Sequence, residues 1–155
     1  MSTFALDLAK FAEKAKERAD EAVGNIIIGL AAELDYRSPV GDPTKWKHPA
    51  PKGYVGGHFR ANWQFGIGIM PGGEVPGVDR SPKNRETGGA TTAGIVAMIP
   101  DDAAGRLYYL VNNTPYAQRL EYEGWSSQAE PGFIVGGAMM NARAIVERTL
   151  AGAKP

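Results

Sequence analysis

The sequence predicts a single α+β domain in which a long N-terminal helix and a C-terminal helix pack against a small, mostly antiparallel β-sheet. Residues 3–35 place apolar side chains every three or four positions, which is typical of one helix face. Residues 59–69 alternate between apolar and polar side chains, which is typical of a strand with one buried face. The 155 residues suffice for one hydrophobic core but not for two. We therefore expect residues 1–155 to form one domain.

The N-terminal helix is predicted to span residues 3–35. Its apolar positions, from Phe4 to Leu30, follow one face, and the charged side chains lie on the other sides. Residues 26–32 are apolar all around the helix. We expect this stretch to be buried in the core or against another subunit.

Two long loops interrupt the predicted elements. Eight of residues 38–57 are glycine or proline, which prevents regular structure, yet Trp46 and Tyr54 stand among them. A flexible linker would not carry a tryptophan, so we expect an ordered, extended loop whose aromatic side chains pack. Residues 71–93 form a second loop without apolar periodicity. A loop this long inside a compact domain is usually functional or becomes ordered on binding.

The sheet is predicted to span residues 59–111 and to include a hairpin. Residues 94–99 and 106–111 are rich in β-forming residues. The aspartates between them favour a turn, so we expect the two strands to pair with each other.

Two helices are predicted to follow the sheet. Thr114 fits a helix cap and Pro115 fits the first helical position, which together open a short helix that ends near Glu121. Apolar residues at three- and four-residue spacing predict the C-terminal helix over residues 133–150.

Few residues in the sequence are suited to catalysis. Cysteine is absent, which excludes thiol nucleophiles, disulfides and zinc sites with cysteine ligands. No glycine-rich nucleotide-binding motif and no nucleophile-elbow motif occurs. His48 and His58 could form a metal site with Asp42, but a metal-binding spacing is missing, and we interpret both as structural or without a role. We expect no catalytic residues, no cofactor and no metal: the protein is not expected to be an enzyme.

The charge balance also narrows the class of function. Seventeen basic and seventeen acidic residues give a net charge of zero, unlike a domain that binds nucleic acid through bulk charge. Residues 38–93 nevertheless carry seven basic and four acidic side chains. A small DNA-binding module that uses the basic loops 45–60 and 80–85 is therefore an alternative of another class. No apolar run approaches the roughly 20 residues that span a bilayer, so we expect no membrane partner and a protein made and used without secretion.

Two sequence blocks carry a recognisable order of residues. The first leads from S-P-V-G-D-P at residues 38–43 to Y-V-G-G-H-F-R-A-N-W at residues 54–63, and the second is N-N-T-P-Y-A-Q-R-L-E-Y-E-G at residues 112–124. In this order they resemble the tail-completion or neck (head–tail joining) proteins of long-tailed bacteriophages, the minor tail protein Z-like family. The resemblance covers roughly residues 25–150, and both long loops are longer here than in the family pattern.

This resemblance implies a structural virion protein at the phage head–tail junction. It implies a homo-oligomeric ring, with six copies as the family expectation, that connects the head-connector protein to the tail tube or tail terminator protein. DNA would then be only cargo that passes through the lumen, and the protein would be assembled in the host bacterial cytoplasm. A tail terminator that caps the tube is the alternative within the same class.

Aromatic and charged residues near the two blocks are the candidates for the assembly interface. Aromatic side chains and arginine dominate the energetics of protein–protein interfaces. The alternation of residues 59–69 also places Trp63 in the core of its own chain. The candidates are Trp46, Tyr54, Arg60, Trp63, Tyr116, Arg119, Glu121 and Trp125.

Overall fold

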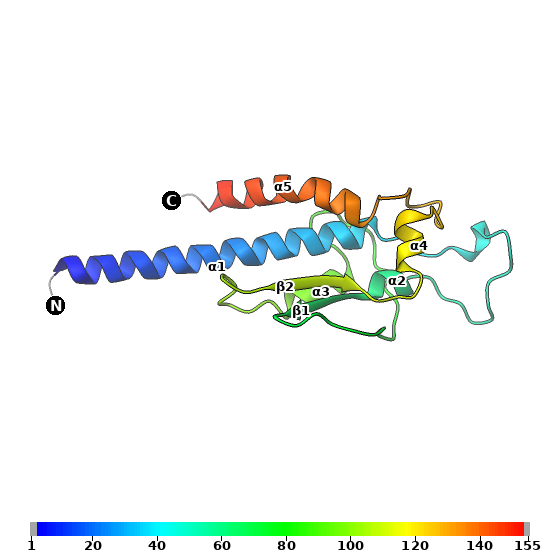
Figure 1. Cartoon of the computed structure of the whole chain (residues 1–155), viewed down its shortest axis with the longest axis horizontal. Helices are drawn as coiled ribbons and strands as arrows, with labels where there is room; N and C mark the ends of the chain where they lie inside the picture. Colours follow the sequence, from blue (N-terminus) through cyan, green and yellow to red (C-terminus); the bar gives the residue numbers. More distant parts are fainter. Residues whose placement is uncertain (1–2, 154–155) are drawn as a thin grey trace.

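The computed structural model describes residues 3–153 and has the α+β architecture that the sequence predicts (Figure 1). Long helices lie at both ends of the chain, and short helices surround a two-stranded antiparallel sheet. In chain order the elements are α1 (Thr3–Arg37), the 3-10 helix η1 (Pro43–Lys45), α2 (His58–Ala61), β1 (Trp63–Ile67), α3 (Ala90–Val96), β2 (Tyr108–Asn112), α4 (Ala117–Tyr122) and α5 (Val135–Gly152).

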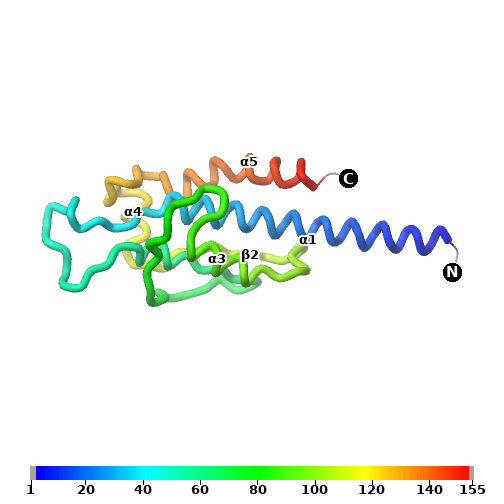
Figure 2. Tube along the Cα trace, turned by 180° about the vertical axis from the view of Figure 1, so that it is seen from behind, coloured from blue at the N-terminus to red at the C-terminus, as the bar shows by residue number. Residues whose placement is uncertain are grey.

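Helix α1 lies between α5 on one side and the sheet with α3 on the other (Figures 1 and 2). Helix α5 runs antiparallel to the second half of α1, while the first half of α1 projects beyond the rest of the molecule. The main cluster of buried apolar residues draws on every layer. Its members are Ile27, Ala31, Leu34, Phe59, Trp63, Phe65, Ile95, Leu120, Ala129, Ile134 and Ala138.

The prediction that residues 26–32 are buried is confirmed. Ile27, Ala31 and Ala32 are buried, and the remaining residues of this stretch are half-buried between α5 and α3. Gly29 makes the close approach of α5 possible, because a Cβ atom there would lie 2.6 Å from Cγ2 of Ile145. This part of α1 is therefore the central layer of the fold.

The predicted strand 59–69 is shorter than expected, and its first residues form helix α2. Gly57, at φ 104°, turns the chain into this helix, and the amide of Ala61 donates to the carbonyl of Gly57. Strand β1 then begins at Trp63 and ends at Ile67. The apolar alternation of the first residues reflects a single helical turn, for which periods of two and of 3.6 cannot be distinguished.

The predicted hairpin of residues 94–99 and 106–111 is wrong. Residues 90–96 form helix α3, and β2 pairs with β1 in antiparallel register, from Trp63 opposite Asn112 to Ile67 opposite Tyr108. The helix begins where distant carboxylates accept its first amides: Asp79 binds Thr91 and Asp35 binds Thr92. Asp35 and Asp79 are distant from α3 in the sequence. Tertiary contacts therefore outweigh the local β-propensity of residues 94–99.

The remaining elements follow the prediction closely. Strand β2 occupies residues 108–112, and α4 and α5 begin and end within two residues of the predicted bounds. The predicted cap of α4 is wrong, because Tyr116 rather than Thr114 stands at its N-cap and Pro115 precedes the helix. The loop 38–57 contains η1 and several turns, one of them closed by the amide of Tyr54 donating to the carbonyl of Pro51, so it is less extended than predicted. The second loop ends at residue 89 because α3 begins there.

Candidate assembly interface

Arg60 is buried inside the chain, so the expectation that it faces a partner is corrected. Its side chain is 0% exposed. Its Nε atom donates to a carboxylate oxygen of Asp35, and its Nη1 atom donates to the carbonyl of Ser81 over 2.6 Å. A second carboxylate, of Asp79, lies 3.5 Å from Nη1. A buried charge needs such paired partners, and Arg60 therefore joins α1, α2 and the second long loop.

Both carboxylates in this cluster also bind the start of α3. Asp35 accepts from the amide of Gly89 over 2.9 Å and from the hydroxyl of Thr92 over 2.8 Å. Asp79 accepts from the amide and hydroxyl of Thr91, each over 2.7 Å. Burial alone would raise the pKa of Asp79, but these bonds and those from Ser81 hold that pKa at about 2. Asp35 and Asp79 thus both hold the start of α3 in place, a role that the sequence did not predict.

The other polar residues of the first sequence block are also engaged within the chain. Trp63 is buried, and its Nε1 atom donates to the hydroxyl of Ser38 over 2.7 Å. Asn62 binds the backbone of Val75 in both directions, over 2.9 Å and 3.1 Å, and so holds the second loop. The predicted interface role of Trp63 is thus corrected in favour of its alternative place in the core.

Glu121, in the second block, is also corrected from partner-facing to internal. Its side chain is 6% exposed, and its carboxylate accepts from three consecutive amides at the start of α5. These amides belong to Ile134 (3.1 Å), Val135 (3.0 Å) and Gly136 (3.0 Å). A carboxylate at a helix N-terminus satisfies amides that have no partner within the helix and opposes the helix dipole. Glu121 therefore fixes α5 to α4.

Two aromatic clusters remain exposed. In the loop 38–57, the rings of Trp46 and Tyr54 lie 4.6 Å apart, with exposed fractions of 43% and 36%. After α4, the guanidinium of Arg119 lies 4.8 Å from the centre of the Trp125 ring, which is 58% exposed. Aromatic contacts and cation–π contacts restrict the motion of their rings, which lowers the entropic cost of binding a partner.

Tyr116 is neither fully buried nor fully exposed. Its ring lies 6.3 Å from that of Phe59 and is half-buried against the core. Burial raises the pKa of its hydroxyl to about 12. Tyr116 thus supports the fold on one side and presents only its other side to solvent.

The two exposed clusters lie at the same end of the molecule. Figure 1 shows the loop 38–57 and α4 together at the end opposite the N-terminus. Gln128 joins the two segments, because its side chain donates to the carbonyl of Val40 over 2.7 Å and accepts from the amide of Val40 over 3.3 Å. We call this region, defined by Trp46, Tyr54, Arg119 and Trp125, the aromatic end.

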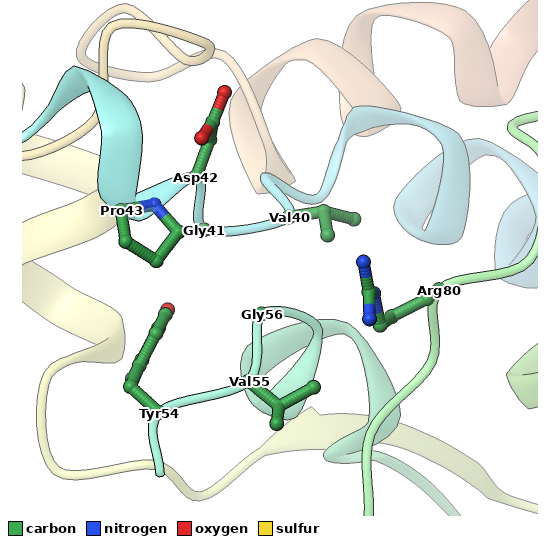
Figure 3. A pocket seen from close by; sticks show the side chains of 8 residues that line it. All are labelled: Val40, Gly41, Asp42, Pro43, Tyr54, Val55, Gly56 and Arg80. Atoms are coloured by element: carbon green, nitrogen blue, oxygen red, sulfur yellow. The ribbon is translucent and has the colours of Figure 1, made fainter. Parts of the chain in front are cut away.

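A shallow hollow of about 400 Å³ lies beside the first cluster (Figure 3). Tyr54 stands on one side with its hydroxyl toward Gly41, and the exposed side chain of Arg80 lies across the hollow (Figure 3). The residues that line it are Val40, Gly41, Asp42, Pro43, Tyr54, Val55, Gly56 and Arg80. The hollow combines an apolar wall with one cation, which suits a protruding side chain of a protein partner.

The histidines do not meet. The ring of His58 lies between two acceptors, with Nε2 2.9 Å from Glu74 and Nδ1 3.1 Å from the carbonyl of Gly77. The hydrogen bond with Glu74 raises the pKa of His58. Within residues 3–153, no three His, Asp or Glu side chains are placed to hold a metal ion.

Part of the basic charge of the middle segment is used internally. Besides Arg60, Arg85 lies over the ring of Tyr36, 4.6 Å from its centre, and 3.9 Å from Glu33. Lys45 lies 3.8 Å from Asp42. The basic loops therefore present fewer free cations than the sequence suggests.

The chain gives no significant match to family models, to curated proteins or to solved structures. None of the helices in residues 3–153 is long and apolar enough to cross a membrane. The resemblance to phage tail-completion proteins thus depends on the two sequence blocks, and Arg60, Trp63 and Glu121 in these blocks are buried within the fold.

Proposed function

We propose that this protein is a structural component of the phage head–tail junction, a tail-completion or neck protein that forms or joins a homo-oligomeric ring. The observation that carries the proposal is the aromatic end, where two aromatic clusters are exposed at the same end of the molecule. Large aromatic side chains held in place on one face are typical of protein interfaces and have no role in the core of the chain.

Buried and exposed candidates have different roles in this proposal. Arg60, Trp63 and Glu121 set the geometry of the loops from inside. Trp46 and Trp125 lie on those loops and are available as anchors for the head-connector protein, the tail tube or the next copy in a ring. The hollow beside Tyr54 would accept a side chain from such a partner. DNA passes through the ring only as cargo.

The decisive experiment is made in the virus. Synthesis of this chain is blocked during infection, and the lysate is imaged by negative-stain electron microscopy. Full heads beside separate tails of normal length are the expected result. Overlong tails would replace the proposal with that of a tail terminator, and intact infectious virions would overturn both.

A pair of variants tests the aromatic end directly. In the double variant Trp46→Ser, Trp125→Ser, both changes are at exposed rings, so we expect a folded protein that no longer enters particles. Leu150→Ser is the matched control, because Leu150 is 52% exposed but lies near the end of α5, away from the aromatic end. Incorporation is measured by quantifying the protein in purified particles. Equal incorporation of the double variant and the control would remove the aromatic end from the interface.

A further inference from the structure

The stripe of α1 that packs against α5 continues beyond the end of α5. Gly29 contacts Ile145, and a step of four residues along α1 brings Glu33 to Asn141, four residues back along α5. The two helices are therefore antiparallel neighbours in constant register. Seven residues before Gly29 on α1 is Ala22, and seven residues after Ile145 on α5 is Gly152. Ala22 and Gly152 line the same hollow, and α5 ends at Gly152.

Among the elements of residues 3–153, none covers the first half of α1. We call residues 3–17 the arm; nearly all of them are exposed, and the arm projects from the molecule in Figures 1 and 2. Phe4, Leu8, Phe11 and Ala15 continue the stripe at steps of four, three and four residues. The exposed fractions of Phe4, Leu8 and Phe11 are 76%, 56% and 71%. A helix of about 15 residues is only marginally stable alone in water, and such a stripe is typical of a coiled-coil seam.

We propose that the arm of a second copy of this chain covers the stripe, in antiparallel orientation. In this register Phe4 of each arm faces Ala15 of the other, and Leu8 faces Phe11. Each large phenylalanine thus faces a smaller side chain, and no two phenylalanines meet in one layer. Asp7 of one arm lies near Lys14 of the other, twice by symmetry, so the flanking charges are complementary.

The position of α5 selects this orientation. The second arm would run in the same direction as α5 and would continue its line along the seam. Its Thr3 would stand opposite Lys16, whereas Gly152 of α5 stands opposite Ala22, so the described parts of the two helices do not overlap. The charged residue Arg18 falls between these two described helix ends. A parallel second copy would instead place its own α1 where α5 already lies.

The length of the seam sets the expected affinity. From Phe4 to Ala15 the stripe is about 17 Å long, at about 1.5 Å per residue. This is short compared with a standard interface, which buries about 1,600 Å². We therefore expect a weak dimer that forms only at high protein concentration.

Sedimentation velocity of the full chain, at concentrations from about 5 to about 500 µM, tests the pair. We expect a concentration-dependent shift from monomer to dimer. Phe11→Glu should abolish the shift and leave the circular dichroism spectrum unchanged, because the side chain contacts solvent in the single chain. Leu6→Glu is the matched control: Leu6 is 45% exposed, lies off the stripe and should leave the dimer intact. A monomer over the whole range, or a dimer that survives Phe11→Glu, would overturn the proposal.

Charge reversal tests the flanking contacts. Asp7→Lys should weaken the dimer several-fold because it brings two lysines together at each end of the seam. The double variant Asp7→Lys, Lys14→Asp should restore the wild-type Kd. Failure of the second change to rescue the first would contradict the antiparallel register.

Disulfide cross-linking determines the relative orientation of the two arms. Single cysteines can be introduced at chosen positions, because the native chain has no cysteine. Leu8→Cys and Phe11→Cys variants are mixed and oxidised. The antiparallel pair predicts that the mixed dimer dominates over both homodimers, whereas dominant homodimers would refute it. The pair is a property of the chain in solution and does not depend on the proposed function. The infection experiment and the sedimentation experiment can therefore fail separately.

Discussion

Replacing Glu121 by alanine should destabilise the fold strongly, even though the residue lies in a sequence block that resembles an interface. Its carboxylate is the acceptor for three amides at the start of α5, at 3.0 to 3.1 Å. A hydrogen bond to a charged group contributes about 1.5 kcal/mol, and a carboxylate at a helix N-terminus contributes about 0.5 kcal/mol more. Water can replace part of this in the variant. We expect the free energy of unfolding to fall by about 3 kcal/mol.

Urea denaturation followed by circular dichroism measures this loss. With an m-value of about 2 kcal/mol per molar urea for a domain of this size, the midpoint should move down by about 1.5 M. Glu121→Gln keeps one acceptor oxygen and should lose about half as much. Glu123→Ala is the matched control, because Glu123 is exposed and its removal should stay within about 0.5 kcal/mol. A midpoint shift for Glu121→Ala no larger than that of the control would refute the internal role.

Two further predictions concern α1 and the second loop. Gly24→Ala should stabilise the protein by about 0.5–1 kcal/mol, since its Cβ would lie at an ordinary distance of 3.7 Å from Ile99. Gly29→Ala should destabilise the protein, because its Cβ would lie only 2.6 Å from the β-branched Ile145. Thermal unfolding measures both changes, and equal shifts of the melting temperature would contradict the packing of α1 against α5. The pKa of His58 is raised by its bond with Glu74, so the stabilisation is fully present below the ordinary pKa near 6.5 and is lost as pH rises through the folded value. Limited proteolysis within residues 71–77 should therefore accelerate on going from pH 6 to pH 8, and the variant His58→Asn should lose that pH dependence; a pH profile shared by both proteins would exclude the histidine.

The sequence predicted those elements whose signals are local and repeated. The long apolar stripe of α1 and that of α5 extend over several turns, so their period is unambiguous. The prediction of a strand over residues 94–99 was wrong because a few β-forming residues give only a weak preference for strand. Its helix depends on Asp35 and Asp79, whose side chains reach the start of α3 from distant parts of the chain. No local pattern contains that information.

The candidate interface could be predicted only in part, for a related reason. Sequence blocks identify residues that matter but do not say whether each side chain points inward or outward. Trp46 and Trp125 are exposed, while Arg60 and Glu121 are buried, although all four belong to the same aromatic and charged set. The difference is made by partners such as Asp35, which stands 25 residues before Arg60. Long-range pairing of this kind becomes visible only in three dimensions.

The cluster around Arg60 also constrains the order in which the chain can fold. Its contacts join residues that lie 25, 21 and 54 positions apart, from the end of α1 to the start of α3. Such contacts require long stretches of chain to close before they contribute any stability, which slows folding and makes it more cooperative. A fragment that ends before Asp79 would leave a guanidinium in the core without its second carboxylate. The end of α1, α2, the second loop and the start of α3 are therefore expected to become ordered together.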